Sequence, residues 1–275
     1  MTGPTAVETA RDYYNSDDAD HFYSTIWGGE DIHVGIYRNE IEPIAEASKR
    51  TVSEMASRLR LGNSTQVLDM GSGYCGAARH LAKEHHVSVT AINLSEVENQ
   101  RARELNKAAN LDGQIEVHDG SFERLPYDSN TFDVVWSQDA ILHSEQLYEV
   151  LAEAFRVLKP GGNFLFTDPM QADDCPDGVL QPILDRIHLS SLGSPGFYLE
   201  SAKQIGFQEV SFDNRTPQLI NHYRRVLEET IARAVELEHH VSADYIQRMK
   251  AGLQYWIDGG EAGHLAWGIF QLCKP

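Results

Sequence analysis

Cysteine is scarce in this sequence of 275 residues. The 3 cysteines, Cys75, Cys175 and Cys273, are an odd number, and no two of them stand at CxxC spacing. A disulfide framework or a thiolate zinc site is therefore not expected, and the pattern favours a reducing cytoplasm. Long apolar runs are also lacking, because no stretch approaches the roughly 20 residues of a membrane helix. Residues 1–10 have neither a basic start nor an apolar run, so we expect no signal peptide.

Basic residues are few compared with acidic ones. Lys and Arg number 23 against 41 Asp and Glu, which gives a net charge of −18. A field of this sign repels nucleic acids and anionic membranes, so neither is expected as a partner. Two explanations of the acidity stay open: a soluble cytosolic enzyme with an acidic surface, or a chain kept soluble in high salt. The sequence also shows no ligand set for a metal.

Between residues 60 and 170, short apolar runs alternate with amphipathic segments. This order predicts a parallel sheet with helices on both faces. The run Lys159-Pro160-Gly161-Gly162 is expected to end a helix and to precede the fifth strand. Predicted strands occupy residues 66–70, 87–92, 114–118, 132–136 and 163–168, and predicted helices occupy residues 76–86, 95–110 and 146–158.

Helical patterns precede and follow this alternation. Residues 1–60 are predicted to form a helical cap over the active site, and residues 61–275 the main domain. Within the main domain, apolar residues at three-and-four spacing predict a helical insert at about residues 216–260, before a last strand at 266–272. The insert is either a lid over the site or a structural buttress, and the pattern favours neither.

The strongest local motif follows the first predicted strand. Gly71, Gly73 and Gly76 match GxGxxG spacing where a strand ends and a helix begins. Glycines at such a turn allow the backbone to bend tightly and to approach a ligand closely. A dinucleotide-binding protein has the same spacing, but an NAD enzyme would carry an acid at the end of the second strand. Asn93 occupies that position, and Asp69 stands two residues before Gly71.

Further motifs follow in order, and together they resemble those of class I S-adenosylmethionine-dependent methyltransferases over residues 60–170. They are residues 118–122 (HDGSF), 125–126 (LP), 132–136 (FDVVW) and 158–162 (LKPGG). The resemblance implies an α/β fold with a Rossmann-like sheet, mostly parallel with an antiparallel last strand. It also implies S-adenosylmethionine as the cofactor and S-adenosylhomocysteine as the product.

A narrower resemblance extends over nearly the whole chain. Residues 22–28 (FYSTIWG) and 136–143 (WSQDAILH) are similar to segments of phosphoethanolamine and of sarcosine/dimethylglycine N-methyltransferases. Residues 91–96 (AINLSE), 166–170 (FTDPM) and 185–189 (DRIHL) resemble the sarcosine/dimethylglycine branch, which forms glycine betaine. The resemblance implies N-methylation of sarcosine, dimethylglycine or both to form this osmolyte, in the cytoplasm, by a monomer or homodimer.

The resemblance also implies contacts to the cofactor. The glycine turn would hold the adenosine part, Asn93 with Leu94 the ribose, and Asp119 the adenine. Three N-terminal residues would close over the cofactor, although core packing is the alternative for Tyr23 and Ile32. The complete implied set is Tyr23, Ile32, His33, Asp69, Gly71, Gly73, Asn93, Leu94, Asp119, Gly120, Ser121, Phe122 and Gln138, of which the last replaces an arginine of some relatives.

The catalytic residues are likewise implied by the resemblance. His143 matches a histidine that pairs with an N-terminal tyrosine in the phosphoethanolamine enzymes. Tyr14 is the best match for that tyrosine, and Tyr13 is its rival. Two roles stay open: the tyrosine and histidine form a latch that closes the site, or His143 or Asp139 receives the proton of the amine.

The implied substrates join a carboxylate to an amine. Arg186 is predicted to bind the carboxylate, because a planar guanidinium can contact both oxygens; Arg224 or Arg225 is the next candidate, and a surface role is the alternative for Arg186. Met170 and Tyr198 are expected to contact the substrate beside it. Aromatic rings would surround the methylated nitrogen, since they attract cations. Two other functions stay open: methylation of phosphoethanolamine or another small amine, and non-catalytic binding of an adenosyl ligand.

Overall fold

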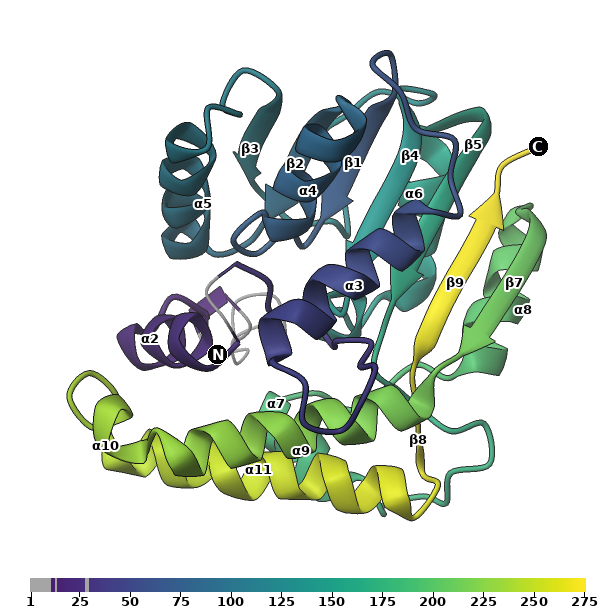
Figure 1. Cartoon of the computed structure of the whole chain (residues 1–275). Coiled ribbons are helices and arrows are strands. Elements are labelled where there is room, and N and C mark those ends of the chain that lie inside the picture. The colour runs from purple at the N-terminus through teal and green to yellow at the C-terminus, as the bar shows by residue number, and fades with distance from the viewer. Residues whose placement is uncertain (1–10, 13, 28–29) are drawn as a thin grey trace, which may run out of the picture.

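Most strands of the chain join one sheet (Figure 1). The computed structural model describes residues 11–12, 14–27 and 30–275, and within them seven strands stand in the order β3-β2-β1-β4-β5-β9-β7. Strands β1 to β5 run parallel, whereas β9 runs antiparallel to its neighbours β5 and β7, so the predicted fold class is confirmed. The strands are β1 (Gln66–Met70), β2 (Ser88–Asn93), β3 (Ile115–Asp119), β4 (Phe132–Gln138), β5 (Leu158–Thr167), β7 (Gln208–Asn214) and β9 (Gly268–Cys273).

Both faces of the sheet are buried under helices. In β1, Val67 belongs to the same core cluster as Leu81, whereas the next residue, Leu68, belongs to a second cluster with Leu151. Successive strand residues point to opposite faces, so a continuous apolar run requires cover on both sides. On the Val67 face this cover is α3 (Ile44–Ala56), α4 (Gly76–His85) and α5 (Glu96–Ala108), and on the other face it is α6 (Leu147–Val157) and α8 (Pro195–Ile205).

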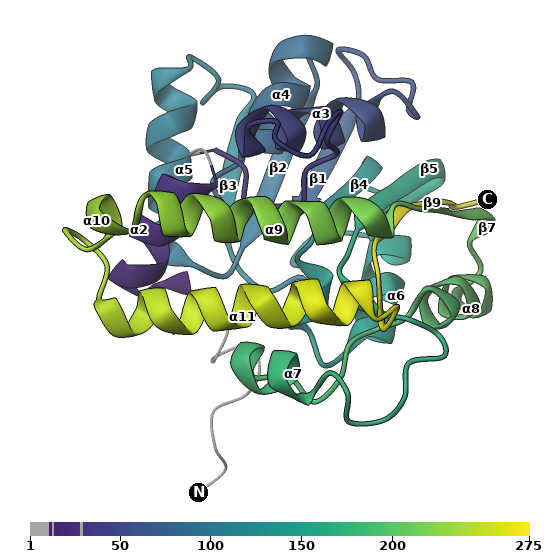
Figure 2. The same ribbon diagram turned by 60° about the horizontal axis from the view of Figure 1, so that its bottom comes forward.

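A helical hairpin crosses the carboxyl ends of the parallel strands. Its two long helices, α9 (Thr216–Ala232) and α11 (Ala243–Glu261), lie side by side in both views (Figures 1 and 2). The N-terminal helix α2 (Asp17–Ile26) packs on this hairpin, because Phe22 shares a third core cluster with Met249. The remaining helices of the described residues are short: η1 (Ile141–His143), α7 (Gln181–Ile187) and α10 (Ala234–Leu237).

The fifth strand begins earlier than the sequence predicts. Strand β5 starts at Leu158, directly after α6, and contains the run Lys159-Pro160-Gly161-Gly162. The pairing with β4 shifts register between Phe132 and Val134, so this run forms an irregular start to the strand. Gly161 adopts a φ of +79°, which a side chain would strain. The run therefore ends α6 as predicted but lies inside the strand instead of preceding it.

A separate two-stranded sheet connects the loop after β5 to the start of the last strand. It pairs β6 (Met170–Gln171) with β8 (Leu265–Ala266) in antiparallel register. Two residues are too few to show an alternating pattern, so the sequence gives no signal for this sheet. Its effect is to hold the chain after β5 against the end of α11.

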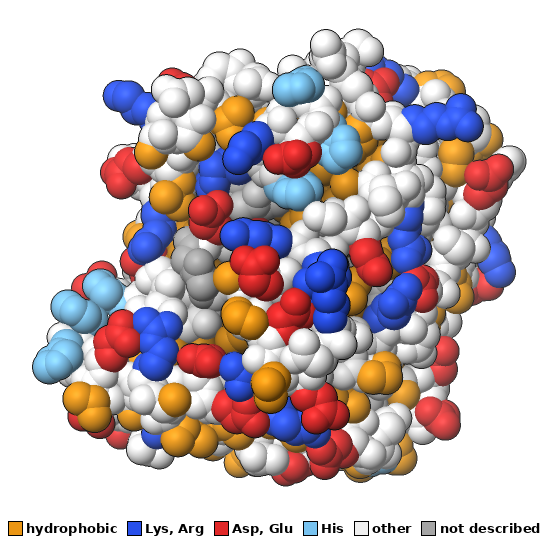
Figure 3. Space-filling model, in the orientation of Figure 1, with side chains coloured by type: hydrophobic (Ala, Val, Ile, Leu, Met, Phe, Trp, Pro, Cys, Tyr) orange, Lys and Arg blue, Asp and Glu red, His pale blue; other side chains and the backbone are white. Residues whose placement is uncertain are grey.

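Charged side chains of both signs are interspersed on the face shown in Figure 3. Several basic side chains form ion pairs: Arg50 Nη1 lies 2.6 Å from Glu42 Oε2, and Arg101 Nη1 lies 2.9 Å from Asp20 Oδ2. The few basic residues thus neutralise part of the acidic excess. Within the described ranges, no helix has the length and apolar character to cross a membrane.

Candidate active site

The loops that follow the parallel strands meet at one edge of the sheet. Gly71 follows β1, Asn93 ends β2 and Asp139 follows β4. In open α/β sheets, ligands bind at the carboxyl ends of the strands. Two adjoining pockets lie at this edge, one on the glycine turn and one walled by α9 and α11.

The glycine turn has left-handed backbone conformations, in which a residue with a side chain would be strained. Gly71 has a φ of +73° and Gly73 a φ of +49°. A Cβ on Gly71 would lie 2.3 Å from Cβ of Ala140, so this glycine makes room for the protein's own loop after β4. A Cβ on Gly73 would lie 3.1 Å from Cδ1 of Ile32, which lines the pocket. A larger residue at Gly73 would therefore intrude on the pocket, whereas one at Gly71 would first disturb the loop after β4, so Gly73 is a better position than Gly71 for a test of ligand binding.

The pocket on the glycine turn, here called the cofactor pocket, has about 560 Å³ of empty space. Gln138 in its wall accepts a hydrogen bond from Nε1 of Trp136 at 2.9 Å. Its Nε2 is buried and has no partner among the described residues. An unpaired amide donor fits an anionic ligand group, such as the carboxylate of S-adenosylmethionine. The pocket gathers these predicted cofactor contacts: Ile32, Gly71, Gly73, Asn93, Leu94, Phe122 and Gln138.

A buried glutamate in the cofactor pocket was not predicted. Glu98 lines the pocket, and its Oε2 accepts a hydrogen bond from Nδ2 of Asn93 at 2.8 Å. Burial raises the pKa of Glu98 to about 7, although the bond from Asn93 lowers it. The end of β2 carries Asn93 instead of an acid, but the carboxyl of Glu98, in the first turn of α5, lies beside it. Its signal in the sequence was the spacing from Ser95, whose hydroxyl caps α5 by accepting from the N–H of Glu98 at 3.1 Å.

Four other predicted contacts do not line the cofactor pocket: Asp69, Asp119, Gly120 and Ser121. Asp119 is half exposed and accepts hydrogen bonds from Asn99 Nδ2 at 2.7 Å and Arg103 Nη2 at 3.2 Å. Gly120 and Ser121 connect Asp119 to Phe122 in the pocket wall. Asp69 is buried in β1, and burial raises the pKa of its carboxyl to about 7.

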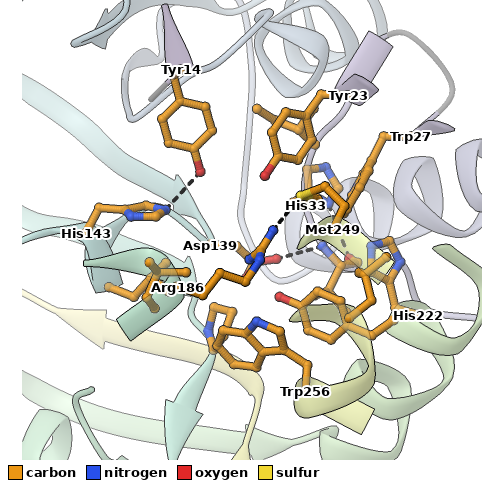
Figure 4. A pocket seen from close by; sticks show the side chains of 17 residues that line it. Tyr14, Tyr23, Trp27, His33, Asp139, His143, Arg186, His222, Met249 and Trp256 are labelled. Carbon is orange, nitrogen blue, oxygen red and sulfur yellow. Dashed lines mark hydrogen bonds between the residues drawn. The ribbon is translucent and has the colours of Figure 1, made fainter. Parts of the chain in front are cut away.

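The second pocket, here called the acceptor pocket, has about 620 Å³ of empty space (Figure 4). Tyr23 and His33, which were predicted to contact the cofactor, line this pocket instead. Rings from three parts of the chain surround it: the centroids of Tyr23 and Trp27 lie 5.0 Å apart, and those of Tyr223 and Trp256 lie 5.1 Å apart. The side chains that line both pockets are Tyr14, Ile32, Asp139 and His143.

Tyr14 and His143 meet at this junction, as the resemblance implied. The Tyr14 hydroxyl lies 2.9 Å from Nε2 of His143, and the two rings meet edge to face. Burial, together with the nearby charge of Arg186, lowers the pKa of His143 to about 4. The imidazole is thus neutral near pH 7, so its Nε2 can accept a hydrogen bond from the Tyr14 hydroxyl. The rival, Tyr13, lies outside the described residues.

Asp139 connects three parts of the chain at the same junction. Its Oδ2 accepts a hydrogen bond from the backbone N–H of Val34 at 2.6 Å, and its Oδ1 accepts one from Nε1 of Trp267 at 2.8 Å. Asp139 adopts a φ of +53°, which an aspartate tolerates better than most residues. Burial raises the pKa of this carboxyl, although the positive charge of His33 opposes the shift. The carboxyl therefore fastens the N-terminal segment to the end of β4.

A buried pair of oppositely charged groups lies in that N-terminal segment. Nε2 of His33 lies 3.4 Å from Oδ1 of Asp31, and both side chains are buried. Burial alone would lower the pKa of His33, but the hydrogen bond and charge of Asp31 outweigh it and raise the pKa. Asp31 packs directly against Gly76. A Cβ on Gly76 would lie 2.2 Å from Oδ1 of Asp31, so only a glycine leaves room for this carboxyl.

Arg186 lines the acceptor pocket, as expected for a carboxylate ligand (Figure 4). Arg186 lies at the end of α7, and its Nη2 is 2.6 Å from the sulfur of Met249 in α11. Neither alternative arginine lines the pocket: Arg224 forms an ion pair with Glu261 of α11 at 2.7 Å, and the largely buried Arg225 forms one with Glu229 at 2.8 Å.

The structure does not bring Met170 and Tyr198 to the acceptor pocket, contrary to expectation. Both are buried in the core beneath β5, with 0% and 1% of their surface exposed. Pro169 lines the pocket, and the next side chain, Met170, points to the opposite side, as successive residues of an extended chain do. Tyr198 is connected to the site only through other residues. Its hydroxyl donates a hydrogen bond to Asp168, which also accepts one from the N–H of Leu142, the residue before His143.

Similarity to known proteins agrees with this geometry. Residues 68–166 match the family described as a methyltransferase domain. Over 98% of its length, the chain is 57% identical to the sarcosine/dimethylglycine N-methyltransferase of Halorhodospira halochloris, and it covers 97% of that protein. It is 51% identical to the protein of the same name from Aphanothece halophytica, over the full length of both. The chain belongs to the sarcosine/dimethylglycine N-methyltransferase family.

As a member of this family, the chain is an N-methyltransferase whose cofactor is S-adenosylmethionine. A solved structure agrees: a candidate sarcosine dimethylglycine methyltransferase from Galdieria sulphuraria has a TM-score of 0.90 and 43% identity, over 95% of this chain and 98% of that one. The methyltransferase-domain match does not include the segment before residue 68 or the α9–α11 hairpin. Much of the acceptor pocket therefore comes from parts that this general domain does not contain.

Proposed function

We propose that this chain transfers methyl groups from S-adenosylmethionine to the nitrogen of sarcosine and dimethylglycine and forms glycine betaine. One observation carries this proposal: an aromatic pocket that contains an arginine adjoins the cofactor pocket. The names of the relatives at 57% and 51% identity support it. A role for the product as an osmolyte in the cytoplasm belongs to the same proposal.

The acceptor pocket suits a methylated amine. Tyr14, Tyr23, Trp27, Tyr223 and Trp256 line it, and aromatic faces attract cations through their ring electrons. Glycine betaine carries a permanent positive charge, which cannot form hydrogen bonds through N–H groups. Rings can stabilise such a group without hydrogen bonds.

Arg186 supplies the positive charge for the other end of the substrate. Its guanidinium lines the acceptor pocket beside Met249, close enough to His143 for its charge to lower the pKa of that imidazole. A planar guanidinium can donate to both oxygens of a carboxylate. The amine would then point from Arg186 toward the junction of the two pockets.

The residues of the junction orient the reaction. When bound, S-adenosylmethionine supplies an electrophilic methyl group on its sulfonium. The nitrogen must present its lone pair in line with that group, so its proton leaves before attack. Nε2 of His143 is engaged by the Tyr14 hydroxyl, and both oxygens of Asp139 accept hydrogen bonds from the protein. These contacts favour a positioning latch over proton acceptance by either residue, so we infer that the proton leaves to water.

The cap and the insert belong to this proposal as closing elements. Residues 1–60 would cover the active site, and the insert at about 216–260 would act as its lid, since α2, α9 and α11 all contribute to the acceptor pocket or its packing. A small amino acid is the proposed partner, and nucleic acid is not. The protein would act as a monomer or homodimer.

A panel of acceptors tests the function. The purified chain is incubated with S-adenosylmethionine and, separately, glycine, sarcosine, dimethylglycine or phosphoethanolamine, and methylated products are identified by mass spectrometry. Production of glycine betaine from dimethylglycine is expected. Rapid methylation of phosphoethanolamine with none of dimethylglycine would reject the proposal, and cofactor binding without any turnover would favour a non-catalytic protein.

A further inference from the structure

Two buried N–H donors in the wall of the acceptor pocket have no partner among the residues that the structure describes. They are Nε1 of Trp27, at the end of α2, and Nε2 of His222, on α9. The side chains are 5% and 0% exposed, and within the described residues neither atom has a hydrogen-bond acceptor. An unpaired buried donor destabilises a folded protein, so such a group often marks the place of a ligand.

The hydrogen bonds of His222 decide which of its nitrogens carries the proton. Its Nδ1 lies 3.1 Å from the backbone nitrogen of Gly35, which can only donate, and 2.9 Å from the hydroxyl of Tyr37. Nδ1 is therefore the acceptor. Burial and the charge of His33 lower the pKa of His222 to about 3, so the ring is neutral and its single proton is on Nε2.

The two donors belong to the acceptor pocket and not to the cofactor pocket. Trp27 and His222 line only the former, and their ring centroids lie 5.6 Å apart. They stand in the same pocket as Arg186 (Figure 4). The wall thus offers two neutral N–H groups and one guanidinium to an acceptor-rich ligand group.

We propose that Trp27 Nε1–H and His222 Nε2–H bind the carboxylate of the amino-acid substrate together with Arg186. This inference rests on the proposed function, and it adds a subsite from the cap and the hairpin. The donor set suits a carboxylate, since one cation matches one negative charge and neutral donors satisfy the remaining lone pairs. A phosphate monoester carries nearly two charges, so this subsite would disfavour phosphoethanolamine.

The test measures binding of two ligands that differ in the proposed contact. Glycine betaine has a carboxylate where choline has a hydroxymethyl group, and both have the same trimethylammonium. Each is titrated by calorimetry into the full chain saturated with S-adenosylhomocysteine. Trp27→Phe keeps an aromatic ring but removes the N–H, so we expect the Kd of glycine betaine to rise by about tenfold to a hundredfold, with choline binding nearly unchanged.

Two further variants complete the experiment. His222→Asn can keep an acceptor oxygen near the position of Nδ1 but has no N–H at the position of Nε2, so it is expected to weaken glycine betaine binding selectively as well. Trp256→Phe makes the same chemical change as Trp27→Phe in another ring of the pocket, and it should leave the ratio of the two Kd values at the wild-type level. Unchanged affinity of S-adenosylhomocysteine and an unchanged melting temperature show that each variant is folded.

The outcomes separate this subsite from the proposed function. If the wild type binds glycine betaine and methylates dimethylglycine, but Trp27→Phe and His222→Asn both retain the wild-type Kd ratio, the subsite is rejected and the function stands. A wild type that neither binds glycine betaine nor methylates dimethylglycine rejects both.

Discussion

The hydroxyl of Tyr14 and Nε2 of His143 lie 2.9 Å apart, although 129 positions separate the two residues in the sequence. The contact joins the N-terminal segment to the end of the short helix η1, and both side chains line both pockets. It therefore stands where the two pockets meet.

Loss of this contact should reduce turnover more than cofactor affinity. We expect His143→Ala and Tyr14→Phe each to lower kcat by about 100-fold, because a small misplacement of the reacting groups is costly. The Kd of S-adenosylmethionine should change little, since neither side chain is implied to bind the adenosine. Steady-state kinetics and calorimetry measure both. A wild-type kcat in both variants would make the contact a packing feature only.

The pH profile gives a second measurement of His143. Burial lowers its pKa to about 4, so the imidazole stays neutral from about pH 5 upward. The profile of kcat/KM in the wild type should therefore show no step near pH 6.5 that disappears in His143→Gln. Such a step would mean that the histidine titrates during turnover.

Asp139 should act through its two donors. In Asp139→Asn, one oxygen of the side chain becomes an NH₂ group, so either Val34 N–H or Nε1 of Trp267 loses its acceptor. A buried donor left unpaired costs about 1–3 kcal/mol in the free energy of unfolding. Chemical unfolding measures this loss. Trp267→Phe removes one donor, so the loss should be smaller when Asp139→Asn is made in that background; strictly additive losses would contradict the coupling.

The buried acid Glu98 should make stability depend on pH. Its pKa is about 7 in the folded chain, against 4.5 as its ordinary value. Between these values the folded state holds the extra proton, so the free energy of unfolding falls as pH rises from about 4.5 to about 7 and this contribution levels off above. Glu98→Gln cannot ionise, and it should reduce the fall by on the order of 2 kcal/mol.

Urea unfolding of the cofactor-free chain at pH 5 and pH 8 measures this effect. Asp69, with its pKa also raised to about 7, contributes a fall of the same sign and remains in the variant. The exposed Glu149 offers a matched control, and Glu149→Gln should leave the pH dependence at its wild-type size. An equal fall in Glu98→Gln and the wild type would show that Glu98 is ionised throughout.

The strands of the sheet could be predicted because their physics is local. An apolar run between breaking residues fixes a buried strand, and β1 matches its predicted range of 66–70. The division of the helical insert into α9, α10 and α11 was harder to predict from the sequence, because the apolar spacing continues through α10 and gives no sign that one helix ends and the next begins. The available signal was Ser242, whose hydroxyl accepts from the N–H of Tyr245 and starts α11.

The site divides in the same way. Gly73, Asn93 and Gln138 stand at strand ends, so the motifs predict that they lie at one edge of the sheet, and all three line the same pocket. Trp27 and His222 come from helices far apart in the chain, and only tertiary packing brings their rings together. No sequence spacing encodes such a contact, which is why this pair of donors was not predicted from the sequence.

Gly252 provides a test of Arg186 that does not alter the arginine itself. A Cβ on Gly252, inside α11, would lie 2.1 Å from Nε of Arg186 and 2.2 Å from its Cδ. Gly252→Ala should therefore displace the guanidinium. It should not weaken the helix, because an interior glycine costs about 0.5–1 kcal/mol relative to alanine.

We expect Gly252→Ala to raise the KM of dimethylglycine by about tenfold, through weaker hydrogen bonds to the carboxylate. Arg186→Lys, which keeps the charge but loses the planar fork, should raise KM in the same direction. Gly259→Ala is the matched control on the same helix, since a Cβ there would lie 3.4 Å from Leu180 and Leu265, an ordinary contact. Cofactor affinity should stay near the wild-type value in all three. If kcat/KM for dimethylglycine is unchanged in Gly252→Ala and in Arg186→Ala, the arginine does not bind the substrate, and the carboxylate must rest on other donors of the pocket.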